Sequence, residues 1–301
     1  MNPFNKLYTI IKYINNHPLA GKHRFTAYRN FLYWQITQLI HEDIKTINFI
    51  ENTKLIVKKG MTGATGNIYL GLHDYYEMSF LLHFLQKDDL FADIGSNIGS
   101  YSILASGVNN ASTIAFEPSL KAFNHLQKNI SLNKLENKVK AINIALGGKI
   151  EKLYFTADLD TANHVLSTDE LQNFGNYSEV NVNTLDNILK GGTTPILIKI
   201  DVEGFETEVL KGMNETLGND NLKAILIELN GSGLRYSYDE RKIHNLLLEH
   251  KFNPYFYDPL KREFKLLKDF GSHNTLYLRD IDFILERVKK AKKINVFKES
   301  F

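Results

Sequence analysis

Short apolar runs alternate with amphipathic segments along most of this chain. Five apolar runs predict strands, at residues 90–94, 113–117, 139–145, 195–201 and 224–229. Between them, amphipathic patterns predict helices at 98–106, 119–132 and 205–217. Such alternation is typical of a parallel sheet, and nearly continuous apolar strands such as 195–201 indicate that helices cover both of its faces. The pattern predicts an α/β fold with a mostly parallel sheet.

The flanking segments predict further elements and a division of the chain. Helical patterns occupy 7–14 and 25–40, residues 54–57 and 61–71 read as strands broken by glycine turns, and a helix is predicted at 75–85. The tail predicts a helix near 239–250 and two strands, near 254–258 and 274–278, that could form an antiparallel edge. We therefore expect a helical N-terminal extension or cap (1–60), a main domain (61–280) and a helical C-terminal tail (281–301).

Composition narrows the possible partners and compartments. The chain has 301 residues, of which 43% are hydrophobic, enough for one large core. Its formal charge of +2 gives no reason to expect nucleic acid or an anionic membrane as the main partner. The absence of cysteine excludes disulfides and thiolate metal sites, and neither a signal peptide nor a membrane span is predicted. We expect a cytoplasmic protein that acts on a small-molecule or glycan acceptor, and its oligomeric state stays open.

The most informative motif is the turn between the strand at 90–94 and the following helix. It reads Asp93-Ile-Gly95-Ser96-Asn97-Ile-Gly99, in which Gly95 permits a sharp turn and Gly99 allows close approach of a ligand. A dinucleotide site would instead read G-x-G-x-x-G, and the acid at this turn suits a cationic ligand. The pattern therefore favours S-adenosylmethionine over NAD.

Further acids follow the neighbouring strands. Glu117-Pro118 ends the second strand, at about the distance expected of an acid that binds ribose hydroxyls. In the strand at 195–201, period-two alternation places Lys199, Asp201 and Glu203 on one side. The next strand ends in Glu228 and Asn230. Because parallel strands end at one edge of a sheet, these groups should line a common crevice, where open α/β folds bind ligands.

Several spaced motifs occur together in order. They are the glycine turn at 93–99, Phe116-Glu-Pro118, Asn129-Ile-Ser-Leu-Asn133, Ala145-Leu-Gly147, Thr184-Leu-Asp186 and Ile198-Lys-Ile-Asp-Val-Glu-Gly204. With them the chain resembles the FkbM-type S-adenosylmethionine-dependent methyltransferases, although Ser96 replaces the usual alanine of the turn. The resemblance implies a class I methyltransferase (Rossmann-like) fold and, usually, O-methylation of a hydroxyl of a sugar, glycan or secondary metabolite.

The resemblance also implies roles for individual residues. The turn residues Asp93, Gly95, Ser96, Asn97 and Gly99 would surround the methionine part of the cofactor. Glu117, followed by Pro118, would bind the ribose hydroxyls, and the segment from Asn143 to Ala145 would border the adenine.

A hydroxyl acceptor must also lose a proton, and three residues are candidates for the base. They are Asp201, Glu203 and His164, with Lys199 beside the first. The sequence favours His164 or Asp201, because Glu203 could simply complement the start of the following helix. The alternative interpretations are a loop-bracing imidazole for His164 and a carboxylate paired with Lys199 for Asp201.

Other functions stay open at this point. Asp201, Glu228 and Asn230 offer the oxygen ligands that Mg²⁺ prefers, so a metal-assisted variant is a weaker alternative. The chain could also be an N-methyltransferase acting on an amino sugar, an NAD-dependent oxidoreductase or a non-catalytic cofactor-binding protein.

Overall fold

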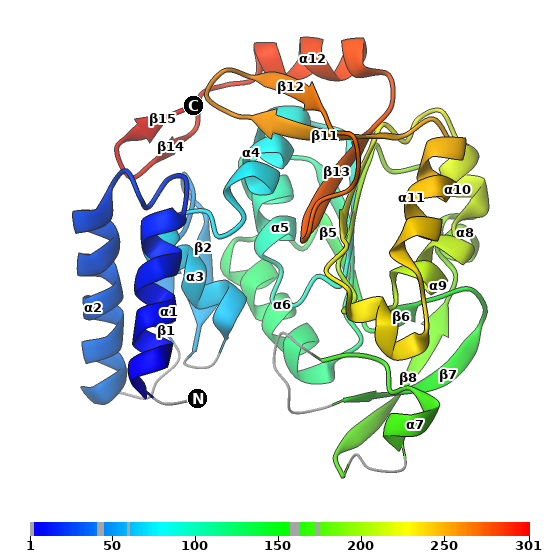
Figure 1. Ribbon diagram of the computed structural model, residues 1–301, viewed down its shortest axis with the longest axis horizontal. Helices are drawn as coiled ribbons and strands as arrows, with labels where there is room; N and C mark the ends of the chain where they lie inside the picture. Colours follow the sequence, from blue (N-terminus) through cyan, green and yellow to red (C-terminus); the bar gives the residue numbers. More distant parts are fainter. Residues whose placement is uncertain (1–2, 41–44, 59–60, 157–162, 172–174) are drawn as a thin grey trace.

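A computed structural model describes residues 3–40, 45–58, 61–156, 163–171 and 175–301. Its centre is an eight-stranded sheet with the order β12-β11-β13-β10-β9-β3-β4-β5 (Figure 1). The parallel strands are β3 (Leu90–Ile94), β4 (Ser112–Phe116), β5 (Val139–Ile142), β9 (Leu197–Ile200) and β10 (Ala224–Glu228). At the other edge, β13 (Asn274–Leu278) runs antiparallel between β10 and β11 (Asn253–Asp258), and β12 (Glu263–Leu266) follows. The predicted α/β fold and the antiparallel edge are confirmed.

Helices cover both faces of this sheet. Successive residues of a strand point to opposite faces, so each central strand contacts helices on both sides. On one face, Leu197 packs in a cluster with α4 (Tyr75–Phe84), α5 (Ser100–Ile103) and α12 (Ile281–Lys290). On the other, Ile198 packs in a cluster with α9 (Glu206–Lys211), α10 (Asn214–Gly218) and α11 (Glu240–Glu249). The helix after β3 continues as a π-helical turn, Leu104–Val108. The central strands β9 and β10 are therefore buried from both sides, as their continuous apolar sequences predict.

The region before the sheet contains the main error of the predictions. Residues 61–71 do not form strands: α3 (Thr62–Leu70) is a helix. Its Tyr69 and Leu70 are buried against α1 (Pro3–Asn16) and α2 (Arg24–Ile40), so tertiary packing outweighs the two glycines. Gly66 is required there, because a Cβ would lie 2.3 Å from the Nδ1 atom of His73.

Two asparagines fasten an N-terminal strand pair onto the domain. β1 (Lys45–Asn48), which was not predicted, pairs with β2 (Lys54–Val57), and β2 lies beside α6 (Leu120–Leu132). Asn129 accepts a hydrogen bond from the Ile56 amide at 2.7 Å and donates one to the Ile98 carbonyl at 2.8 Å. Asn133 binds both backbone groups of Lys54, each at 2.8 Å. The two asparagines therefore bind backbone groups of β2 that do not pair with β1. Asn129 also links β2 to the glycine turn.

The helix predicted at 205–217 is broken into α9 and α10 at Gly212. A Cβ at Gly212 would lie 2.1 Å from the Gly147 carbonyl, so the break allows two loops to touch. Asp186 of the Thr-Leu-Asp motif then caps α10 by accepting hydrogen bonds from Glu215 and Thr216. The motif has a structural role, which its sequence does not reveal.

Smaller elements complete the described chain. The polar segment after β5 forms a sheet of β6 (Ala145–Leu146), β8 (Tyr177–Asn183) and β7 (Glu151–Thr156), with the short helices α7 (Thr168–Leu171) and α8 (Leu185–Leu189). The tail is helical only as far as Lys290, because the Arg262 guanidinium binds the last carbonyls of α12, and β14 (Asn295–Val296) and β15 (Glu299–Ser300) form a hairpin. No helix in the described part of the chain is long and apolar enough to cross a bilayer.

Candidate active site

A cavity of about 330 Å³ opens at the carboxyl ends of the parallel strands. Eleven of the predicted site residues line it: Asp93, Gly95, Ser96, Asn97, Glu117, Pro118, Ala145, Lys199, Asp201, Glu203 and Glu228. Four others do not: Gly99, Asn143, His164 and Asn230. The predicted crevice exists, and the acids of four neighbouring strands meet in it.

The glycine turn takes the shape that its sequence predicts. Gly95 has a φ of +78°, and a Cβ there would lie only 1.8 Å from the Asp201 carbonyl oxygen. Gly99 is also left-handed, at +89°, and its missing Cβ leaves room for Leu126 of α6. The two glycines therefore permit close contacts within the protein: Gly95 brings the turn against the end of β9, and Gly99 seats the start of α5 on α6.

Asp93 is the most deeply buried acid of the cavity. Its side chain is 1% exposed, and its Oδ2 atom accepts a hydrogen bond from the Ser102 hydroxyl at 2.6 Å. Its Oδ1 atom is buried and has no hydrogen-bond partner among the described residues. Burial raises its pKa, although the nearby Lys199 ammonium opposes that shift. A buried carboxylate oxygen without a donor is costly, so this atom fits a donor group of a ligand.

Glu117 joins the first two strand ends. Its two carboxylate oxygens accept hydrogen bonds from the backbone amides of Asn97 and Ser119, each at 2.8 Å. Burial raises its pKa to about 7 despite these bonds. Asn143 lies behind the site and donates to the backbone carbonyls of Glu117 and Pro118. The cavity wall beyond this point is apolar and includes Ile144, Ala145 and Leu146.

The end of β9 carries an ion pair within the cavity. The Lys199 ammonium donates a hydrogen bond to Asp201 at 2.7 Å, as their shared strand face predicts. It also lies 4.9 Å from the centre of the Tyr101 ring, whose hydroxyl donates to Asp74 at 2.9 Å. Burial works against the charge of Asp201, but the Lys199 ammonium outweighs it and lowers the pKa of that carboxyl. Asp201 is therefore ionised and already partnered.

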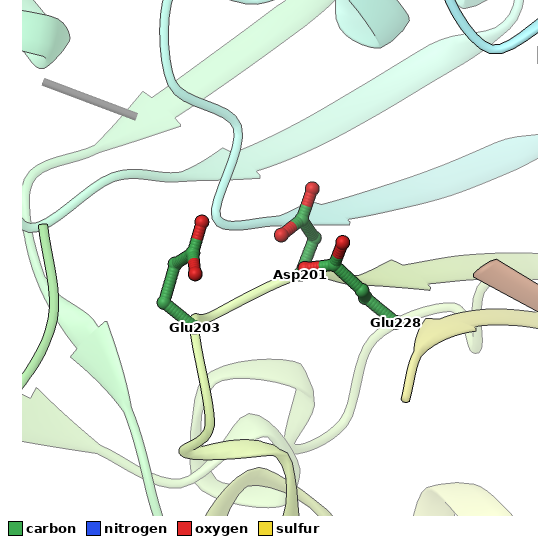
Figure 2. A group of neighbouring side chains, drawn as sticks. All are labelled: Asp201, Glu203 and Glu228. Carbon is green, nitrogen blue, oxygen red and sulfur yellow. The ribbon is translucent and has the colours of Figure 1, made fainter. Parts of the chain in front are cut away.

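Three carboxylates meet beside this pair. Figure 2 shows Asp201 and Glu203 extending from the same strand end, with Glu228 reaching in from the next strand, and their oxygens lie within 4.8 Å of one another. Burial and the charge of Asp201 raise the pKa of Glu203 to about 7 and that of Glu228 to about 9. At neutral pH, Glu228 therefore holds a proton while Glu203 is poised between its two forms. Glu203 also has a φ of 55°, an unusual backbone conformation for a residue other than glycine.

Of the predicted magnesium ligands, Asp201 and Glu228 come together, but Asn230 does not join them. Asn230 is exposed and its Oδ1 atom accepts a hydrogen bond from the Ser232 amide, so Glu203 takes its place beside Asp201 and Glu228. Lys199 already balances the charge of Asp201, which leaves less negative charge for a hard cation. This donor set does not fit Mg²⁺.

Two expectations about the base change as well. His164 is 4% exposed, and its Nε2 atom lies 3.2 Å from Glu170, so the ring braces its own loop while its neighbours Asn163 and Val165 line the cavity. The start of α9 is complemented by Glu206, which accepts hydrogen bonds from the amides of Val202 and Gly204. Glu203 is thereby left facing the cavity.

Sequence reasoning missed the wall of the cavity that lies outside the motifs. It comes from Met61, Ala64, His73, Asp74, Met78 and Asn274. Of these, Asp74 alone gave a signal, as a polar residue directly before the predicted helix at 75–85. Of the others, Ala64 is part of α3, Met78 is part of α4, and Asn274 begins β13, which inserts beside β10.

Comparison with known proteins agrees with this geometry. The Methyltransferase FkbM domain matches residues 93–254. The match begins at Asp93 of the glycine turn and ends at the start of β11. The chain belongs to the FkbM methyltransferase family. It is a methyltransferase of the class I fold, and the family's cofactor is S-adenosylmethionine.

The individual proteins that match this chain have low sequence identity to it. The hexuronic acid methyltransferase AglP of Haloferax volcanii is 28% identical over 179 residues, covering 58% of this chain and 67% of its own. A crystal structure of the methyltransferase FkbM from Methylobacillus flagellatus is 16% identical with a TM-score of 0.45, and the match covers 72% of this chain but only 54% of that one. A putative transferase from Pyrococcus horikoshii is 13% identical with a TM-score of 0.41, over 79% and 71% of the two chains.

Proposed function

We propose that this methyltransferase transfers a methyl group from S-adenosylmethionine to a hydroxyl of a sugar or glycan. The observation that carries the proposal is the unpartnered, buried Oδ1 atom of Asp93, a residue that lines one cavity with Glu117 and with the acids of β9 and β10. A cationic group that donates hydrogen bonds would satisfy Asp93 without a phosphate-binding loop.

The cofactor half of the cavity fits the parts of S-adenosylmethionine in order along the strand ends. Asp93 would bind the amino group of the methionine part, and Glu117 would accept hydrogen bonds from the ribose hydroxyls with its remaining lone pairs. The apolar wall at Ile144 and Ala145 would border the adenine. The acceptor would then lie over β9 and β10, beside the three carboxylates.

Glu203 is the base that the geometry supports best. The bound cofactor supplies an electrophilic methyl carbon, so the protein's tasks are to align the acceptor oxygen and remove its proton. A base works best with a pKa near the working pH, and that of Glu203 is about 7, whereas Asp201 is ionised and held by Lys199. The protonated Glu228 would donate a hydrogen bond to a second acceptor oxygen, which orients the sugar.

The charges of this half favour an acceptor without a carboxylate. Among the described residues that line the cavity, Lys199 alone is a lysine or arginine, and Asp201 already pairs with it. A hexuronic acid, the substrate class named for the Haloferax volcanii relative, would bring another negative charge to Asp201, Glu203 and Glu228. A neutral or amino sugar would avoid that repulsion.

The test is methyl transfer from labelled S-adenosylmethionine to a panel of neutral, amino and uronic methyl glycosides. We expect label on a hydroxyl of the neutral and amino sugars, and loss of that label in Glu203→Gln. Label on the uronic acid alone would contradict the acceptor class, and label on nitrogen would contradict O-methylation. Cofactor binding without transfer to any glycan would favour a non-catalytic protein.

A further inference from the structure

Helix α2 has two apolar faces, and the described structure covers only one. Its inner face, formed by Ala27, Phe31 and Trp34, is buried. Its outer face carries apolar side chains at helical spacing, with exposed fractions of 82% for Phe25, 57% for Leu32, 69% for Tyr33 and 54% for Ile36. Large apolar side chains that gather on one exposed face usually mark an interaction surface.

Helix α2 lies at the edge of the molecule, away from the central sheet (Figure 1). The neighbouring helix α1 also has an exposed aromatic side chain, Tyr8, at 67%. None of the exposed apolar residues of α2 lines the cavity at the strand ends, so a partner that covers them would leave the proposed reaction in place.

The charge of this region differs from that of the rest of the chain. Residues 1–41 contain five cationic side chains, Lys6, Lys12, Lys22, Arg24 and Arg29, and no aspartate or glutamate. Since the whole chain has 36 basic and 34 acidic residues, the part after residue 41 is acidic overall. Within the described structure, Arg24 and Arg29 donate to uncharged oxygens, those of Gly21 and Asn30, so their charges are not balanced there.

We propose that the outer face of α2 docks on an anionic lipid bilayer. Helices that lie in a membrane interface combine an apolar stripe with lysine and arginine, because the stripe enters the acyl boundary while the cations meet lipid headgroups. Pairing with a second copy through the same face would place two positively charged faces against each other, which costs electrostatic energy. A bilayer surface with negative charge satisfies both the stripe and the cations.

The experiment is co-sedimentation of the full chain with vesicles of equal parts phosphatidylcholine and phosphatidylglycerol, compared with vesicles of phosphatidylcholine alone. Leu32→Asp is compared with Leu266→Asp, a leucine of β12 with nearly the same exposed fraction, 57% against 58%. Both positions are at the surface, so both variants should melt like the parent. We expect binding to the anionic vesicles only, weakened about tenfold by Leu32→Asp, unchanged by Leu266→Asp and lost in high salt.

Three results would overturn the proposal. One is equal binding to both kinds of vesicle, and another is an equal effect of the two substitutions. The third is a protein that does not bind vesicles and instead forms a dimer, which Leu32→Asp separates into monomers. The last result would assign the same face to a second copy. Light scattering of both variants without lipid detects it, and none of these readouts depends on methyl transfer.

Discussion

The two halves of the cavity are built in different ways. In the cofactor half, Asp93, Asn97 and Glu117 come from one short stretch of chain, and hydrogen bonds from the Ser102 hydroxyl and the Asn97 amide hold the two carboxylates. In the acceptor half, Asp74, Glu203 and Glu228 come from distant segments, and the charge of Asp201 acts on both glutamates. A constant ligand suits the rigid, local half, whereas the dispersed half gives the family room to change its acceptor.

The largest effect on stability and cofactor binding is expected at Gly95, where the two halves of the cavity touch. Gly95→Ala would force a Cβ to within 1.8 Å of the Asp201 carbonyl at a left-handed φ, so we expect it to destabilise the fold by about 4 kcal/mol and to abolish cofactor binding. Gly218→Ala is the matched control, because no atom lies within 4 Å of a Cβ built there. Thermal melting and calorimetry with S-adenosylhomocysteine measure both effects. Similar melting of the two variants would contradict the close contact.

Glu203→Gln should impair the acceptor half of the cavity and leave the cofactor half unchanged. Removal of the base should lower kcat by about 10²-fold, while the affinity for S-adenosylhomocysteine stays within about twofold of the parent. Glu263→Gln, an exposed residue of β12, should change neither quantity. Steady-state kinetics and calorimetry provide the comparison, and an unchanged kcat in Glu203→Gln would remove this residue from the role of base.

The acceptor half should also give the reaction its pH dependence. Glu203 accepts a proton only when it is ionised, so kcat/KM should rise about tenfold per pH unit below about 7 and then level off. Above about 9, Glu228 loses the proton that it donates, and kcat/KM should fall. Glu203→Gln should flatten the acidic limb alone. A profile that is flat from pH 5 to 8 in the parent would show that Glu203 does not limit the reaction.

The smallest effect concerns the link from the N-terminal strands to the glycine turn. Asn129→Ala would leave the Ile56 amide and the Ile98 carbonyl without partners, at a cost of about 2 kcal/mol. Because Ile98 belongs to the turn, cofactor affinity should fall severalfold as well. Asn133→Ala, which loses contacts to Lys54 but none to the turn, should lower the melting temperature only. Equal cofactor affinities in the two variants would show that Asn129 has a structural role only.

The same division explains how much the sequence could predict. The strands β3 and β4, the glycine turn and the acids Asp93 and Glu117 follow from local spacing, and the structure places them as predicted, whereas the strand expected at 139–145 ends at Ile142 and Ala145 belongs to another sheet. The helix at Thr62–Leu70 could not be predicted, because its burial against α1 and α2 outweighs its two glycines. The sequence identified the polar residues at the ends of β9 and β10. It could not show whether Asn230 or Glu203 lies beside Asp201 and Glu228, because that depends on how the loops after these two strands turn.

Two further limits have a physical origin. His164 carried a plausible signal for a base, but its orientation is set by Glu170, six residues along the same loop. The nearly neutral net charge of the chain argued against an anionic membrane, although it averages a basic N-terminal region with an acidic remainder. Whole-chain charge therefore says little about a surface formed by one segment.

The central claim is that Asp93 holds the cofactor and Glu203 serves the acceptor, and one calorimetric titration with S-adenosylhomocysteine tests it most directly. We predict that Asp93→Asn weakens binding about 100-fold, since the buried carboxylate loses its charge toward the amino group, while Glu203→Gln binds like the parent. Parent-like binding by Asp93→Asn, or an equal loss in both variants, would contradict the division of the cavity.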